Sequence, residues 1–273
     1  MGVTMSANVG RGVGASAVAV GASHHPPRRG KGCVEVVSLA LLESMQGNLL
    51  LTKAVAMAIY VKNHTRDSRV KDYTPNKLRK LVRLHHNTVR KYVDELSLWR
   101  LVRMEGRDMV FDSLKNRHGK NFSIGTTAGR TIKQLENQLL SAQVVLIVKR
   151  KEYVKQLIDK ANNPKRSNKK DDYEDFKRAR RECKRYGYTT PFVDNGLSYK
   201  GIARRLGISL QKAEEVVRYA TTQGMLVKHT NQVQKRMDGI GRATKFLDGV
   251  GRVTFVTKNN MYVILANTYS LPS

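Results

Sequence analysis

One pattern occurs twice in this chain and restricts its fold more than any other feature. Residues 78–96 and 198–223 each contain two short segments with apolar residues at helical spacing, separated by a tight turn. In the later copy, Ala203 stands where two helices must approach closely, and Gly207 suits a turn that needs a left-handed residue. Ser209 can then cap the second helix. The pattern predicts two helix–turn–helix units, each at the centre of a small domain.

The earlier copy has the same division between apolar and polar positions. Thr74 can cap its first helix, with Pro75 at the first helical position, where a missing N–H is not needed. The residues expected to bury the inner faces of both helices are Leu78, Leu81, Val82, Leu84, Val89, Tyr92, Val93 and Leu96. The residues left outside are Arg83, His85, His86, Asn87, Thr88, Arg90 and Lys91. This unit is therefore expected to present a cationic, hydrogen-bonding surface.

A strand, a turn and a second strand are predicted directly after the earlier copy, over residues 99–104, 105–108 and 109–111. A helix–turn–helix followed by a β-hairpin resembles the winged helix-turn-helix superfamily of DNA-binding domains. The resemblance implies an α+β fold, mainly α with small β-hairpins, in which tandem winged-helix domains are joined by a long helix. Arg79 and Arg83 depart from the family pattern, which usually has small residues there, and Arg83 is expected to widen the turn.

Shifts in composition divide the chain into four parts. Residues 1–32 are rich in glycine and end in a basic stretch, which predicts a flexible arm. The first winged-helix domain is assigned to residues 33–125, the connecting helix to 126–163 and the second winged-helix domain to 164–273. Within the first domain, Gly47 and Asn48 are expected to separate two helices.

The connecting segment has apolar residues in a helical rhythm from 131 to 162, with no glycine or proline inside it. Such a helix is either a spacer or a homodimer contact, because sustained apolar stripes on exposed helices find partners. Val144 to Val148 could instead pack back on a winged-helix core. The stripe favours self-association.

The region after the later copy is basic and rich in glycine. Asp238-Gly239 and Asp248-Gly249 indicate two bends in a long basic hairpin, or a coincidence within a loop. Residues 253–256 and 261–265 are predicted to form a hairpin that closes the sheet of the second domain.

The charge of the chain indicates its class of partner. Fifty Lys and Arg residues against 22 Asp and Glu residues give a formal net charge of +28, which calls for a polyanion such as nucleic acid. No apolar run is long enough for a membrane span, and the N-terminal residues do not resemble a secretory signal. Cys33 and Cys183 lie far apart, so neither a disulfide scaffold nor a metal site is expected. These features favour a cytoplasmic, nucleoid-associated protein.

The resemblance implies that the second helix of each unit reads the major groove of double-stranded DNA. Asn87 suits adenine and Arg90 suits guanine, whereas Glu214 and Glu215 either accept from cytosine or face away. The residues assigned to DNA are Arg83, His86, Asn87, Thr88, Arg90 and Lys91 in the first unit, and Lys200, Arg204, Ser209, Gln211, Lys212 and Arg218 in the second. The wings are expected to add Arg103, Arg107, Lys228, Lys235, Arg236, Arg242 and Lys245.

Motifs for catalysis are missing from the sequence. No phosphate-binding glycine loop, zinc-protease motif or clustered carboxylates for a two-metal nuclease is present, so we expect no enzymatic activity and no cofactor. The sequence predicts a sequence-specific DNA-binding protein, either a transcriptional regulator or a replication initiator of a phage, plasmid or prokaryote. The alternative is a packaging or ribonucleoprotein component that binds DNA or RNA without sequence preference.

Overall fold

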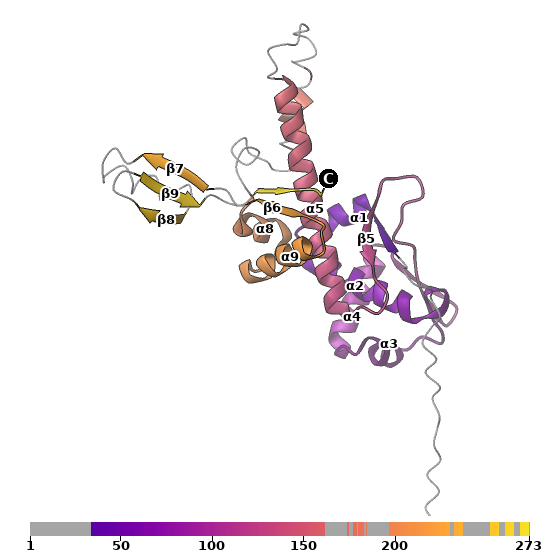
Figure 1. Cartoon of the computed structure of the whole chain (residues 1–273). Coiled ribbons are helices and arrows are strands. Elements are labelled where there is room, and N and C mark those ends of the chain that lie inside the picture. Colours follow the sequence, from indigo (N-terminus) through magenta and orange to yellow (C-terminus); the bar gives the residue numbers. More distant parts are fainter. Residues whose placement is uncertain are drawn as a thin grey trace, which may run out of the picture.

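The computed structural model describes residues 34–161, 174, 177, 178, 180–182, 184, 197–229, 232–236, 252–256, 260–264 and 268–272. The expected arm at residues 1–32 lies outside them. In the described residues, helices are combined with short antiparallel strands, as the α+β expectation required (Figure 1). The elements of the first part are β1 (Val34–Ser38), α1 (Leu39–Ser44), α2 (Leu49–His64), a short 3-10 turn (Arg66–Ser68), β2 (Arg69–Val70), α3 (Pro75–Val82), α4 (His86–Leu98), β3 (Val102–Glu105), β4 (Asp108–Phe111) and β5 (Asn121–Thr126). They are followed by α5 (Ile132–Ala161), α8 (Tyr199–Leu206), α9 (Leu210–Thr222), β6 (Val227–His229), β7 (Gln232–Arg236), β8 (Arg252–Val256), β9 (Asn260–Ile264) and β10 (Thr268–Ser270).

Helix α2 forms the centre of the first core. Nine of its 16 residues are buried, so it packs against neighbours on several sides rather than along one stripe. It begins after Gly47 and Asn48, as predicted, and the Asn48 side chain accepts a hydrogen bond from the Leu51 N–H at 3.0 Å. The strand β1 was not predicted, since the apolar residues from Val34 onward also fit a helical spacing. Its run of β-branched valines suits the pairing with β5 that the structure contains.

Helices α3 and α4 have the limits that their capping residues predict. Thr74 accepts a hydrogen bond from the Lys77 N–H at 3.2 Å, and Pro75 is the first residue of α3. The turn to α4 has three residues, and Arg83 adopts a left-handed backbone with φ of 54°. The expectation that Arg83 widens the turn is wrong. Arg83 takes the backbone conformation that Gly207 takes after α8, at a cost of about 1–2 kcal/mol for a residue with a Cβ atom.

The hairpin predicted after α4 is confirmed. Strands β3 and β4 pair antiparallel, with Glu105 opposite Asp108 at the turn. The short strand β2, which was not predicted, pairs with the other edge of β4. This three-stranded sheet contacts α4 through β3.

Helix α5 has the predicted extent, but it is more than a spacer. The apolar residues that it gives to the core around α2 are Leu135, Leu139, Ala142 and Leu146. Those that it gives to the core of α8 and α9 are Leu140, Val144, Val145, Ile147 and Val148. The alternative in which Val144 to Val148 packs within the chain is therefore the observed one. The homodimer predicted through helix 131–162 was based on an exposed apolar stripe. The two cores of this chain already cover that stripe, so it gives no support to a homodimer.

The second helix–turn–helix unit matches its prediction residue by residue. Ser209 accepts a hydrogen bond from the Lys212 N–H at 3.2 Å, and Gly224 ends the unit with φ of 66°. Gly207 has φ of 65°, and a Cβ atom built on it would lie 3.1 Å from the carbonyl oxygen of Gly47. The turn of the second unit thus touches the turn between α1 and α2.

The last strands differ from the expected arrangement. Strands β8 and β9 form the predicted hairpin, but β9 also pairs with β7, in a separate three-stranded sheet. Strand β6 pairs with β10 instead, so the hairpin does not close the sheet that contains β6. Figure 1 shows the β7–β9–β8 sheet standing apart from α8 and α9. The turns at Asp238-Gly239 and Asp248-Gly249 lie outside the described residues.

Across the described part of the chain, every helix is too short or too polar to cross a membrane. Even the 30-residue helix α5 interrupts its apolar stretch with Lys149, Arg150 and Lys151.

The contact between Gly207 and Gly47 predicts a difference between two glycine substitutions. Gly207→Ala and Gly224→Ala both place a Cβ atom on a left-handed residue, which costs about 1–2 kcal/mol. Only the Cβ atom at position 207 meets backbone, whereas nothing lies within 4 Å of the one at position 224. We expect Gly207→Ala to lower the free energy of unfolding by clearly more than Gly224→Ala, measured by urea denaturation. Equal losses would contradict the close approach.

The shared helix predicts coupling between the cores. Leu139 and Leu140 are both fully buried, but Leu139 belongs to the first core and Leu140 to the second. We expect Leu139→Ala and Leu140→Ala each to cost about 2–5 kcal/mol. Each substitution should also reduce the hydrogen-exchange protection of both α2 and α9. Protection lost on one side only would show that the two cores unfold independently.

Candidate nucleic-acid interface

Helix α4 presents a polar face to solvent because its apolar residues fix its orientation. Val89 and Leu96 are buried, and Tyr92 and Val93 are half-buried. The residues this packing leaves exposed are His86, Asn87, Arg90 and Lys91, with Thr88 half-buried beside them. Exposed residues three and four positions apart lie on one face of a helix. The structure therefore brings together the side chains that the sequence assigned to the first reading helix.

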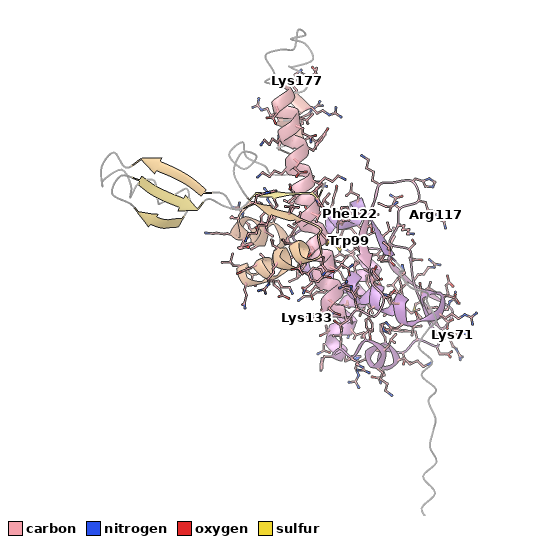
Figure 2. All side chains as sticks on the ribbon, viewed as in Figure 1. Lys71, Trp99, Arg117, Phe122, Lys133 and Lys177 are labelled. Atoms are coloured by element: carbon pink, nitrogen blue, oxygen red, sulfur yellow. The ribbon has the colours of Figure 1, made fainter. Side chains whose placement is uncertain are left out.

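Helix α3 adds cations that the sequence analysis did not assign to the site. Leu78 and Val82 are buried, and the side chains exposed opposite them include Lys77, Arg79 and Lys80. Arg83 is exposed at the end of the same helix. These cations could have been predicted from the sequence, because the helical spacing of the basic residues from 76 to 83 places them opposite the buried Leu78 and Val82. Figure 2 shows Lys71 near the same end of the molecule as α3.

The β3–β4 hairpin neutralises most of its own charge. Arg103 forms ion pairs with Asp112 and, at 2.7 Å, with Glu105. Arg69 on β2 forms ion pairs with Glu105 at 2.5 Å and with Asp108 at 3.2 Å. The assignment of Arg103 to DNA stays a prediction, but its guanidinium already has two carboxylate partners within the protein. Arg107 at the turn is exposed and keeps its assignment.

The carboxylates of the hairpin are held in their charged form. The hydrogen bond from Arg103 lowers the pKa of Glu105, and the charge of Arg69 adds to that effect. The backbone N–H of Asp72 lowers the pKa of Asp108, with a further contribution from Arg69. These arginines and carboxylates thus stabilise each other within the hairpin.

The second unit exposes fewer cations than its sequence suggested. On α8, Lys200 and Arg204 are exposed. On α9, Gln211 and Arg218 are exposed, but Glu214 lies between them on the same face. Ser209 is exposed, and its oxygen already accepts the capping hydrogen bond from Lys212.

Lys212 faces α5 instead of a ligand. Its Nζ atom donates to Asn137 Oδ1 at 2.6 Å and forms an ion pair with Glu215 Oε2 at 3.3 Å. The Asn137 amide also donates to Glu215 Oε1 at 2.9 Å, and this hydrogen bond is the main cause of the lowered pKa of Glu215. The assignment of Lys212 to DNA stays a prediction, but its ammonium group already joins α9 to α5. Glu215 faces α5 and not the outer surface. Facing away was one of the two arrangements expected for it.

The remaining assigned residues belong to the last strands. Lys228 on β6 is exposed. Lys235 and Arg236 lie on β7, but their side chains are outside the described residues. Arg242 and Lys245 lie outside them altogether.

The two units therefore differ in their exposed charge. The exposed face of α4 contributes Arg90 and Lys91, and none of the ion pairs among the described residues includes either of them. The exposed face of α9 contributes one arginine and one glutamate. Chemically, the first unit can bind a polyanion with two free cations, an amide and an imidazole on a single helix face.

A scan of the chain against protein-family models matches no family, and searches of curated proteins and of solved structures return no match.

The bond between Asn137 and Glu215 predicts a pH-dependent contribution to stability. Because folding lowers the pKa of Glu215 below its ordinary value of 4.5, the ionised carboxylate stabilises the fold above that value. This contribution is lost as the pH falls through the folded-state pKa.

We expect Glu215→Gln to lower the free energy of unfolding at pH 7, measured by urea denaturation. The difference in this free energy between variant and wild type should narrow below about pH 4.5. The matched control is Glu214→Gln on the exposed face. A gap that stays constant from pH 7 to pH 3 would contradict the prediction.

Proposed function

We propose that this protein binds double-stranded DNA in a sequence-specific manner, with tandem winged-helix units of which the first is the principal reader. The supporting observation is the exposed face of α4, where Asn87, Arg90 and Lys91 project from a helix held by buried neighbours. An α-helix of this kind fits the major groove of B-DNA. The net charge of +28 supports a polyanionic partner.

Within this proposal, α4 supplies base contacts and α3 supplies phosphate contacts. Asn87 has the paired donor and acceptor that adenine requires, and Arg90 has the fork of donors that guanine requires. Lys80 on α3 and Arg83 directly after it carry charges suited to the phosphate backbone on either side of the groove. Base contacts provide the sequence preference, and phosphate contacts provide most of the affinity.

The second unit has a supporting part in the proposal. Its exposed α9 face has Gln211 and Arg218 but also Glu214, whose carboxylate repels phosphate and can accept only from a base such as cytosine. Lys200 and Arg204 on α8, with Lys228 on β6, are the cations available for the backbone. We therefore assign to this unit mainly phosphate contacts. Transcriptional regulation and replication initiation both remain roles that such a protein could fill.

The test uses the full chain and a duplex selected by it from a random pool. A sequence-specific protein should prefer the selected duplex over random duplex and RNA by about 10³-fold at physiological salt. Arg90→Ala with Lys91→Ala should weaken binding to the selected duplex on the order of 100-fold, because base contacts are worth about 1–3 kcal/mol each. Binding to random duplex should weaken less. Fluorescence anisotropy across a salt series measures all three affinities.

The matched control removes the same charge elsewhere. Lys149→Ala with Lys155→Ala changes two exposed lysines on α5 and should reduce affinity only slightly and equally for every sequence. Equal losses from both double variants would show that α4 does not read bases. A wild-type protein with strong salt dependence and no sequence preference would instead be a packaging or ribonucleoprotein component.

A further inference from the structure

The loop between β4 and β5 carries a concentrated positive charge that the first unit does not use. Residues 115–120 read Lys-Asn-Arg-His-Gly-Lys, and all six are exposed. Three of them are the basic residues Lys115, Arg117 and Lys120, and His118 adds an imidazole. The sequence analysis did not assign any of these residues, because the loop belongs to neither helix–turn–helix unit nor hairpin.

The loop is ordered by its own hydrogen bonds. The Asn121 amide donates to the carbonyl oxygens of Asn116 at 2.9 Å and Gly119 at 3.2 Å, while its oxygen accepts from the Asn116 N–H at 2.9 Å. The Asn116 oxygen in turn accepts from the His118 N–H at 3.0 Å. Such a network fixes the backbone that carries the cations before any ligand arrives, which lowers the entropy lost on binding.

The base of the loop is fixed to the first core. The Ser38 N–H donates to the Leu114 carbonyl at 2.7 Å, and the Leu39 N–H donates to the Lys120 carbonyl at 2.8 Å. Leu114 is buried, with 2% of its surface exposed. The loop therefore projects from a rigid foundation rather than from a free strand end.

The positive charge of the loop is not offset by any carboxylate among the residues that the structure describes. None of the ion pairs among the described residues includes Lys115, Arg117 or Lys120. The nearby hairpin is the opposite case, since Arg69 and Arg103 are matched there by carboxylates. An ordered group of three unmatched cations has the chemistry to bind several phosphates at once.

The loop lies away from the proposed reading surface. Figure 2 places Arg117 at the upper right of the first unit, whereas Figure 1 places α3 and α4 at its lower end in the same view. A short duplex bound along α4 would leave the loop exposed. The loop is thus in a position to contact a different segment of nucleic acid.

We propose that the 115–120 loop binds the phosphate backbone of a second DNA segment, so that one protein molecule bridges two duplexes. This inference rests on the proposed function of α4. The contact is independent of sequence, because the loop offers charged donors to phosphates and has no helix to enter a groove. A bridging protein of this kind would bring its specific site next to other DNA.

The test is a capture experiment with the full chain. The selected duplex is fixed to beads, saturated with protein and washed, and the retention of a labelled random duplex is then measured. Lys115→Ala, Arg117→Ala and Lys120→Ala together should reduce retention at least about 10-fold, while affinity for the selected duplex changes less than about 3-fold. The salt dependence of retention should also become weaker, because fewer counterions are released.

Two controls separate the loop from general charge and from its shape. The charge-conserving variant Lys115→Arg, Arg117→Lys and Lys120→Arg should retain the second duplex. Lys149→Ala, Lys155→Ala and Arg178→Ala remove three exposed cations on helical residues elsewhere and should also retain it. Equal losses in this distal variant and the loop variant would overturn the proposal.

The remaining outcomes are distinguishable. If wild-type protein binds the selected duplex but retains no second one, or if the alanine loop variant retains it fully, the bridging proposal is wrong and the proposed function stands. If no duplex is preferred at all, the proposed function fails first. If the loop variant loses only the binding of labelled RNA, the surface serves RNA and the inference is overturned.

Discussion

The burial of α5 between two apolar cores is the interaction on which the rest of the structure depends. Apolar contact has no direction of its own, so it cannot by itself fix how helices are placed along one another. Two buried hydrogen bonds supply that direction. Gln143 donates to the Thr52 hydroxyl on α2 at 3.2 Å, and Ser141 donates to the Val216 carbonyl on α9 at 3.2 Å. The same helix thereby positions α2 on one side and α9 on the other, and α2 in turn supports α4. The position of α5 therefore determines how the exposed faces of α4 and α9 are oriented.

Sequence reasoning succeeded where the determinant is local. Pro75, Gly207 and Ser209 act through the backbone of their own turn, so their effect can be read from neighbouring residues. The limits of both helix–turn–helix units and the extent of α5 follow from such signals. It failed where the determinant is a distant strand. The pairing of β1 with β5 and of β6 with β10 joins segments far apart in the chain, and no local pattern specifies the partner.

The candidate site divides in the same way. The exposed face of α4 could be predicted because apolar residues at helical spacing show which side is buried. Sequence reasoning could not predict which individual cations form ion pairs or hydrogen bonds within the protein. Lys212 has its partner Asn137 75 residues earlier on α5, and Arg103 has Asp112 on the far side of a hairpin. A count of basic residues treats each of them as free charge, whereas the folded chain has already matched them. Among the described residues, the cations on α4 and in the 115–120 loop take part in none of the ion pairs, so their charge is not offset by a carboxylate.

Neighbouring residues of α5 serve different cores, and this restricts how the chain can vary in length. Leu139 and Leu140 pack into different cores because consecutive helical residues are rotated by about 100°. Inserting or deleting a single residue between Leu135 and Val148 would turn every later side chain by that angle and carry leucines and valines out of their pockets. A change of one residue in length within 135–148 is therefore expected to disturb both cores, whereas the buried residues beyond it, Val154 and Leu157, belong to neither core.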